Sequence, residues 1–458
     1  LAAREPLDVA IGLFLLQGEA TREEAEALLG AEAVEALAEA GILEVRGARG
    51  RARVAAAVSL YPCAGGLFAT DHRWRPAGRA DRRAPAEPVM YLGGDSYALA
   101  YLAPRRPVGA ALDLCTGSGV HAVLAARHAE RVVAVDLSPR ALAFGRLNAA
   151  MNGVAEKIAW VRGDLFDALP AGERFDLVLA NPPFVPTPHR GRARIAFRDA
   201  GATGEEVLAR LVAGLPGRLA RDGTAAIVSI FAELEGELYR ARLERWLPRG
   251  SQLAGLLVRF GVDGPPDYAQ GQTRRAYGDS LEEHRARLGR WVETLRRARV
   301  ARLSGGILAL RAHGGPTPPW FRALDVPWPA HALPDELERA WRSCDAAQSV
   351  VFAEDLLDRA ARVPDDLVLV TEAERPSPGA PPVPARHRAR RAGGLGPEVG
   401  LSRELHGLLA VCDGATPLRR ELQKLAEAFD ADAAALADQL LPDLLELVAR
   451  GLLALEKT

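Results

Sequence analysis

Residues 109 to 311 alternate between short apolar runs and longer amphipathic stretches, and this alternation restricts the chain to few folds. Short apolar runs are typical of strands buried on both faces, and most of the stretches between them have helical periodicity. Strands joined through helices form a mostly parallel sheet covered on both faces. We therefore predict an α/β core domain here. The expected strands are Gly109–Leu114, Arg131–Val135, Ile158–Arg162, Phe175–Ala180, Thr224–Ile230, Leu253–Phe260 and Ser304–Leu310.

The first expected strand ends in "DLCTGSG", residues 113–119, directly before an expected helix. Gly117 and Gly119 allow a backbone to approach a ligand closely at the carboxyl end of a first strand, where open α/β sheets bind cofactors. Cys115 stands where a dinucleotide fingerprint has its first glycine, a third glycine is missing, and the sequence has no phosphate-binding loop. These departures disfavour a ligand that presents a pyrophosphate.

Two aspartates follow the next two expected strands. Asp136 comes about twenty residues after the glycine loop, where a carboxylate can accept hydrogen bonds from both hydroxyls of a ribose. Asp164 ends the third strand, in the matching place to accept from an adenine amine. Either aspartate alone is more typical of a helix N-cap or a solvated loop. Together they indicate a site for a nucleoside.

The fourth expected strand stops at Asn181-Pro182-Pro183-Phe184. Two prolines fix two φ angles and restrict the residue before them to extended backbone, so the turn is stiff. The side-chain carbonyl of Asn181 and the backbone carbonyl of Pro182 could both accept hydrogen bonds from a planar NH₂ group, which would aim the nitrogen lone pair at an electrophile. Phe184 offers a face for stacking. No general base is required, because the proton can leave to water after transfer.

The chain resembles the class I S-adenosylmethionine-dependent methyltransferases, in the Asn-Pro-Pro-Phe/Tyr branch of N-methyltransferases that is also known as the methyltransferase small domain. The resemblance covers about residues 90–311 and lies in "DLCTGSG", "AVDLSPRALAFGRLNAAMNG", "GDLF" and "NPPFVP", in that order. Within the branch the motifs are similar to those of protein-glutamine and ribosomal-RNA guanine-N2 methyltransferases. The "FRDAG" at 197–201 is closer to a less characterised bacterial group.

This resemblance implies a Rossmann-like core with a seven-stranded sheet. It implies S-adenosyl-L-methionine as cofactor and S-adenosyl-L-homocysteine as product. The implied catalytic residues are Asn181, Pro182, Pro183 and Phe184. The implied cofactor contacts are Asp113, Cys115, Thr116, Gly117, Gly119, Asp136, Leu137, Asp164, Leu165 and Asn181. Tyr97 and Arg198 are candidate substrate-binding residues, and Ser96 is expected to cap a helix.

Helical units are expected on both sides of this core. Three short helices and a hairpin between Leu7 and Leu60, with a capping box at Thr21 and Glu24, resemble a winged helix, although a plain packing unit fits as well. Residues 401–458 again read as three helices and a strand. The expected domains are 1–88, winged-helix-like with a basic connector; 89–313, the methyltransferase domain; 314–400, a Pro/Arg-rich linker region; and 401–458, winged-helix-like.

Composition excludes some classes of function and leaves others open. A formal net charge of −1 over 458 residues gives no global signature of a nucleic-acid binder. Four scattered cysteines without a Cys-x-x-Cys pair argue against a zinc site or a disulfide framework and favour a reducing cytoplasm. No apolar run approaches the roughly 20 residues of a membrane span. We expect no metal and no membrane partner, and the oligomeric state stays open.

The leading hypothesis is methylation of a planar or amine nitrogen on a macromolecule, either a base of RNA or DNA or a protein side chain. A methyltransferase for a small molecule or a peptide natural product is the alternative enzyme. A winged-helix binding module with an inactive core is the alternative without catalysis. Local arginines leave two readings each, contact with an anionic substrate or plain solvation; they occur in the connector 71–85 and at Arg190, Arg192, Arg194 and Arg198.

Overall fold

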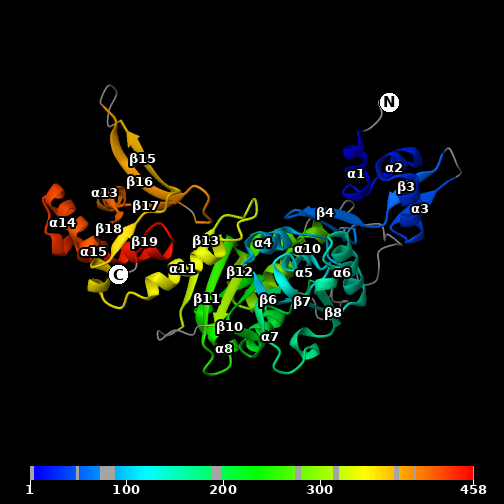
Figure 1. Cartoon of the computed structure of the whole chain (residues 1–458), viewed down its shortest axis with the longest axis horizontal. Helices are drawn as coiled ribbons and strands as arrows, with labels where there is room; N and C mark the ends of the chain where they lie inside the picture. The colour runs from blue at the N-terminus through cyan, green and yellow to red at the C-terminus, as the bar shows by residue number, and fades with distance from the viewer. Residues whose placement is uncertain are drawn as a thin grey trace. The chain divides into compact units, whose positions relative to one another are not determined.

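The computed structural model of the chain describes residues 5–47, 51–72, 88–186, 198–273, 280–312, 319–375, 381–396 and 398–456 (Figure 1). The chain divides into two compact units. Unit 1 comprises Leu1–Tyr101, Arg105–Ser251 and Val262–Ala312, and unit 2 comprises Leu102–Pro104, Gln252–Gly261 and His313–Thr458. No helix among the described residues is long and apolar enough to cross a membrane.

A mixed eight-stranded sheet has the spatial order β13-β11-β12-β10-β9-β6-β7-β8. The neighbours β8, β7, β6, β9 and β10 are parallel, whereas β12 runs antiparallel to β10. The chain leaves β6 toward β7 and β8 and then returns to place β9 on the other side. The strands are β6 (Val108–Leu114), β7 (Ala129–Asp136), β8 (Ile158–Arg162), β9 (Phe175–Ala180), β10 (Leu219–Leu234), β11 (Leu253–Asp263), β12 (Val300–Ala312) and β13 (Phe321–Val326).

All seven expected strands are present, but the expectation of a seven-stranded sheet is wrong. The eighth strand, β13, pairs in parallel with β11, from Gly255 opposite Phe321 to Phe260 opposite Val326. Its six residues stand between prolines on both sides, which is a composition typical of a linker. Pairing with an existing strand therefore overrides a weak local signal.

Helices pack on the strands of unit 1 and bury its core. Helices α5 and α6 contact β6, β7 and β8, while α9 and α10 contact β12. Interior residues of the strands, such as Leu112 on β6 and Leu177 on β9, are almost fully buried. The helices of this core are α4 (Gly94–Leu102), α5 (Val120–Ala125), α6 (Pro139–Met151), α7 (Glu206–Gly214), α8 (Tyr239–Trp246), α9 (Pro265–Gln272) and α10 (Leu281–Arg297), with one-turn helices at Ala155–Lys157, Leu165–Ala168 and Leu215–Gly217.

The amino-terminal segment of unit 1 has a small core of its own, which includes Val9, Leu13, Val34 and Val54. Its strands form a sheet of order β1-β3-β2. The expected capping box of Thr21 and Glu24 is present at the start of α2. The elements are α1 (Pro6–Phe14), β1 (Glu19–Thr21), α2 (Arg22–Leu29), α3 (Ala31–Glu39), β2 (Leu43–Arg46) and β3 (Arg53–Ala56).

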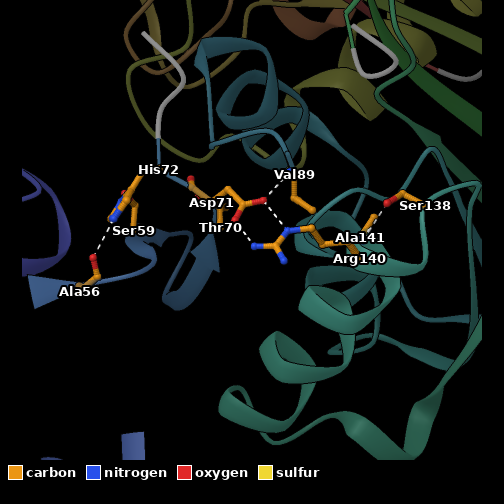
Figure 2. Close-up of polar contacts among 9 residues, drawn as sticks. All are labelled: Ala56, Ser59, Thr70, Asp71, His72, Val89, Ser138, Arg140 and Ala141. Carbon is orange, nitrogen blue, oxygen red and sulfur yellow. Dashed lines mark hydrogen bonds and ion pairs between the residues drawn. The ribbon is translucent and has the colours of Figure 1, made fainter. Parts of the chain in front are cut away.

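A hairpin of β4 (Ser59–Cys63) and β5 (Gly66–Thr70) follows and lies along α6. Figure 2 shows how the chain beyond β5 is fixed: the carboxylate of Asp71 lies between the guanidinium of Arg140, near the start of α6, and the backbone N–H of Val89. Asp71 is 2% exposed, whereas the Arg140 side chain is 44% exposed, so the carboxylate of this ion pair is shielded from solvent and the guanidinium is not. The expected connector 71–85 lies outside the described residues from 73 onward.

Unit 2 corrects the expectation that residues 314–400 form a linker, because strands and helices occupy most of its described part. One three-stranded sheet has the order β15-β16-β17 and another the order β18-β14-β19. Its elements after β13 are α11 (Glu336–Gln348), α12 (Ala353–Leu357), β14 (Ala360–Arg362), β15 (Leu367–Glu374), β16 (Val383–Arg391), β17 (Val399–Leu401), α13 (Arg403–Val411), β18 (Asp413–Pro417), α14 (Leu418–Phe429), α15 (Ala433–Ala449) and β19 (Ala454–Leu455).

Candidate active site

The candidate site lies within unit 1, at the carboxyl edge of four neighbouring parallel strands. Because β8, β7, β6 and β9 all run the same way, their last residues meet at one edge of the sheet. Asp164 follows β8, Asp136 ends β7, Asp113 stands near the end of β6, and Asn181 follows β9. The topology therefore brings together the four polar side chains that the sequence places at strand ends.

Asp113 anchors the glycine loop after β6. Its Oδ2 accepts hydrogen bonds from the Thr116 hydroxyl and, at 2.9 Å, from the backbone N–H of Ala122 on α5. The loop has left-handed backbone at Cys115 (φ 55°) and Gly117 (φ 54°), a conformation that favours glycine at the second of these positions. The carboxylate thus ties a strained turn to the first turn of the following helix.

The other oxygen of Asp113 has no such partner. Oδ1 is buried and makes no hydrogen bond to any described residue, and the whole residue is 1% exposed. Burial is the main cause that raises the pKa of this carboxyl to about 7, against an opposing contribution from the Thr116 hydrogen bond. A buried acceptor without a partner at the end of a first strand fits a ligand that supplies a donor there.

Asp136 holds the same loop from the side of β7. Its Oδ2 accepts from the backbone N–H of Gly117 at 2.9 Å, and its Oδ1 accepts from that of Ser138 at 2.9 Å. The side chain is partly exposed, and burial raises its pKa. Leu137 beside it leaves 62% of its surface exposed, which is unusual for a leucine next to a buried strand end.

Asp164 is paired at the surface: Arg210 of α7 donates to its Oδ2 at 2.9 Å, and the Asp164 side chain is 44% exposed. The next residue, Leu165, is buried and has left-handed backbone (φ 49°). Burial, followed by the charges of Asp136, Asp113 and Asp164, raises the pKa of the Cys115 thiol well above its usual range. The thiol is therefore protonated and unreactive near neutral pH.

Asn181 is oriented by a residue that the sequence patterns did not single out. Its amide nitrogen Nδ2 donates to Oδ2 of Asp95 at 2.8 Å and lies 3.3 Å from the hydroxyl oxygen of Ser96. Its oxygen Oδ1 accepts no hydrogen bond from the described residues. Asp95 is in the first turn of α4, where an acidic residue is common for local reasons. Its position directly before Ser96 was therefore the only feature of the sequence that pointed to Asp95. Ser96 is buried and faces Asn181, and α4 begins before it, at Gly94.

Pro182, Pro183 and Phe184, which follow Asn181 in the motif, pack into the protein. Pro182 is buried, and Pro183 and Phe184 are partly buried. Phe184 packs against a cluster that contains Tyr268 and Trp291. A Cβ on Gly204 would lie 2.2 Å from the carbonyl oxygen of Phe184, so only glycine allows the chain to pass there. The stiff turn expected from the prolines is thus held by packing as well.

The candidate substrate residues have partners in the protein. Arg198 donates to Gln272 at 2.9 Å, and its guanidinium lies 5.7 Å from the centre of the Trp291 ring. The Tyr97 hydroxyl donates to the carbonyl of Pro62 in β4 at 3.0 Å, and burial raises its pKa to about 12. Arg190, Arg192 and Arg194 lie outside the described residues. Substrate contact by any of these residues stays a prediction.

The glycine loop has the shape that a cofactor site requires. At Gly117 an added Cβ would meet only the carbonyl oxygen of Cys115, at 4.0 Å, so open space faces this glycine. At Gly119 it would lie 2.8 Å from the Trp160 ring, so this glycine serves packing. The open space at Gly117, the buried free oxygen of Asp113 and the exposed Leu137 leave room and an acceptor for a ligand at this edge of the sheet.

Comparisons with known proteins agree with this geometry. Residues 111–198 match the family described as Methyltransferase domain. The chain is 38% identical over 143 residues to a ribosomal protein uL3 glutamine methyltransferase of Bradyrhizobium diazoefficiens, which is 29% of this chain and 44% of the relative. It is 36% identical over 184 residues to a release factor glutamine methyltransferase of Bordetella pertussis, which is 33% of this chain and 66% of the relative.

A solved 16S rRNA N2 methyltransferase from T. thermophilus overlaps with 49% of this chain and 55% of its own, with 22% sequence identity and a TM-score of 0.28. The chain spans about half the length of the first curated relatives that it matches, between 44% and 57%. The family match at residues 111–198 spans the glycine loop, Asp136, Asp164 and the Asn181 motif.

Proposed function

Since the chain contains a class I S-adenosylmethionine-dependent methyltransferase domain related to the protein-glutamine methyltransferases, we propose that it methylates the side-chain amide nitrogen of a glutamine in a protein substrate. The relatives are named for a ribosomal protein and a release factor, and the same chemical class of substrate is proposed here. The active site of this reaction is the edge of the sheet between Asp113 and Asn181.

The observation that carries this proposal is the state of the Asn181 carboxamide. Its NH₂ end is engaged by Asp95, so its oxygen is the end left to accept from a substrate. The carbonyl of Pro182 follows directly in a rigid backbone. Two acceptors in this arrangement suit a primary amide, which has two N–H donors on one nitrogen. Hydrogen bonds to both N–H groups withdraw the nitrogen lone pair from conjugation and direct it at the electrophile.

We further propose that S-adenosyl-L-methionine is held by the glycine loop and the two aspartates, with Asp113, Cys115, Thr116, Gly117, Gly119, Asp136, Leu137, Asp164, Leu165 and Asn181 around it. When bound, this cofactor supplies a methyl group on a sulfonium. Asp136 would accept from ribose hydroxyls, and the Oδ1 atoms of Asp113 and Asp164 are the acceptors that the protein itself leaves over. Leu137 would lose its exposed surface against the bound nucleoside.

Both ends of the chain are proposed to be winged-helix-like units. In the amino-terminal segment the order α1-β1-α2-α3-β2-β3, with the sheet β1-β3-β2, supports this proposal, because a winged helix combines a helix-turn-helix with a hairpin. In unit 2 the order α13-β18-α14-α15-β19 repeats it, and β14, from earlier in the chain, takes the central place in the sheet β18-β14-β19. The third strand thus comes from before the helices instead of after them.

The charge of the amino-terminal segment favours a protein over a nucleic acid as its partner. In winged helices that bind DNA, the helix equivalent to α3 enters the groove. Here α3 exposes Glu32, Glu35 and Glu39, and the preceding α2 adds further glutamates. Acidic side chains repel phosphates and would cost affinity instead of releasing counterions. This supports a protein substrate for the neighbouring active site.

The proposal is tested by incubating the purified chain and cofactor labelled in the methyl group with a cell extract, and then digesting with nuclease or with protease. We expect protease alone to release the label from macromolecules. Acid hydrolysis of the labelled protein should then release volatile methylamine, because an N-methylated amide hydrolyses to a carboxylic acid and an amine. Label that nuclease removes, or that stays on a non-volatile amino acid, would overturn the proposal.

A further inference from the structure

We propose that Asp95 is a positioning residue of this active site, whose carboxylate keeps the Asn181 carboxamide in the one orientation that leaves its oxygen to the substrate. The inference rests on the proposed function. It adds to the site a residue that lies outside the Asn181 motif and that the names of the relatives do not suggest. It concerns an interaction within unit 1 between the start of α4 and the end of β9.

The residues around Asp95 hold its carboxylate against Asn181. Oδ2 of Asp95 lies 2.8 Å from Nδ2 of Asn181, although the two residues are 86 positions apart. An added Cβ on Gly93 would lie 2.4 Å from Oδ1 of Asp95, so the glycine leaves the space that this carboxylate occupies. The backbone N–H groups of Asp95 and Ser96 also donate to the carboxylate. The acid is therefore held in one position before any substrate binds.

The chemistry of the pair decides which way the amide points. The oxygen and the nitrogen of a carboxamide are nearly equal in size, so packing alone does not distinguish the two orientations of Asn181. An ionised carboxylate only accepts hydrogen bonds, so it selects the orientation with NH₂ toward Asp95. In the reversed orientation the amide would present N–H groups to the N–H groups of the substrate, and the clamp would not form.

The same reasoning makes the orientation depend on the protonation of Asp95. The groups that donate to its carboxylate, the amide of Asn181 and the backbone N–H groups of Asp95 and Ser96, are all uncharged. Burial raises its pKa. A protonated Asp95 can donate to Oδ1 of Asn181, which favours the reversed amide. Among the described residues, other titratable side chains around α4 include Tyr61, Cys63, Tyr97 and Tyr101, and the cations near Cys63 are Arg105 and Arg127. The pKa of Cys63 is raised to about 11 and that of Tyr97 to about 12, so neither titrates in the acidic range.

The first test compares Asp95→Asn with Ser96→Ala. Asp95→Asn keeps the shape of the side chain but can donate as well as accept, so Asn181 is no longer held in one orientation. We expect kcat to fall roughly 10- to 100-fold and the affinity for S-adenosylhomocysteine to stay within about threefold. The acidic limb that titration of Asp95 is expected to give the wild-type kcat profile should disappear. Ser96→Ala should keep that limb. An unchanged kcat with an unchanged limb, or an equal loss of product affinity, would overturn the positioning role.

The second test needs no turnover and separates this inference from the proposed function. In protein labelled with ¹⁵N at asparagine, the side-chain signals of Asn181 are identified by their loss in Asn181→Ala. At neutral pH they should lie at different positions in the wild type and in Asp95→Asn, and on acidification they should move in the wild type alone. If they differ between the two proteins but no glutamine is methylated, the proposed function fails and the positioning role stands. If they coincide in the two proteins at every pH, the positioning role fails whatever the substrate is.

Discussion

The carboxylate of Asp113 shapes the glycine loop and at the same time holds an unsatisfied oxygen inside the protein. Two donors, from Thr116 and Ala122, bind one of its oxygens, while the other is buried without a partner. Sites that bind ligands often keep such groups, which are costly in the free protein and are satisfied on binding. The residue that organises the loop therefore also lowers the stability of the free protein above a certain pH.

This cost has a definite pH dependence. In the unfolded chain the Asp113 carboxyl has its ordinary pKa of 3.8, and in the folded protein burial raises that pKa to about 7. Between these values the folded state holds more protons than the unfolded state, so the free energy of unfolding falls as pH rises. The stabilising contribution is complete below pH 3.8 and lost above pH 7, with an upper limit of about 4 kcal/mol.

Asp113→Asn should remove this dependence. Relative to the wild type, we expect the variant to gain stability steadily as the pH is raised from 4.5 to 8, because its amide does not ionise. Denaturant unfolding of both proteins across this range measures the difference. A difference that is independent of pH would show that Asp113 keeps an ordinary pKa in the folded protein.

At this scale the sequence predicted acceptors and missed what orients them. Asp113, Asp136, Asp164 and Asn181 could be located because each follows an apolar run, and parallel strands bring such ends together. Asp95 could not, because an aspartate in the first turn of a helix is common for local reasons. Its hydrogen bond to Asn181 joins segments 86 residues apart, and only the fold brings the start of α4 and the end of β9 together.

Among the elements, α6 connects the hairpin of β4 and β5 to the glycine loop. Asn148, fully buried on α6, accepts from the backbone N–H of Ala69 at 2.7 Å and donates to its carbonyl at 2.8 Å, as a neighbouring strand would. The same amide nitrogen donates to the carbonyl of Ser118 in the glycine loop at 2.8 Å. One turn later Asn152 repeats the two bonds with Leu67, at a more exposed position and without a contact to the loop.

Asn148→Ala and Asn152→Ala therefore form a matched pair. Asn148→Ala leaves three buried backbone groups without partners, and we expect a loss of roughly 2–4 kcal/mol in the free energy of unfolding. It should also weaken S-adenosylhomocysteine binding, because the loop loses an anchor. Asn152→Ala should cost about 1 kcal/mol or less and leave binding unchanged. Denaturant unfolding and calorimetry measure both effects, and equal effects of the two changes would contradict this role of α6.

Strands and helices whose sequence patterns differ clearly from those of loops were predicted, and those with weak patterns were missed. The parallel strands β6, β7, β8 and β9 are largely apolar runs, and each was expected within two residues of its observed bounds. β10 (Leu219–Leu234) begins five residues before and ends four residues after the expected Thr224–Ile230. β13 was missed because its alternating residues lie among prolines, and β15 and β16 because charged and apolar residues share both strands. Strands of this kind form through pairing with partners, which a local pattern does not contain.

For the whole molecule, the division into two units confines the proposed chemistry to one of them. The glycine loop, the three aspartates, Asn181 and Asp95 all belong to unit 1, together with the acidic helices of the amino-terminal segment. Unit 2 contains the helices α13, α14 and α15 and a sheet in which β14 supplies a strand from earlier in the chain. The proposed methyl transfer is thus assigned to unit 1, and the sequence motifs that predict it all lie within that unit.

The account depends most on the oxygen of Asn181 as an acceptor for the substrate nitrogen, and Asn181→Ala tests this directly. We measure S-adenosylhomocysteine binding by calorimetry and methyl transfer to the protein substrate at saturating cofactor. The account predicts a loss of at least about 100-fold in kcat, because a transition-state interaction is removed, with product affinity within about threefold of the wild type. Turnover that survives the substitution at near wild-type rate would contradict it.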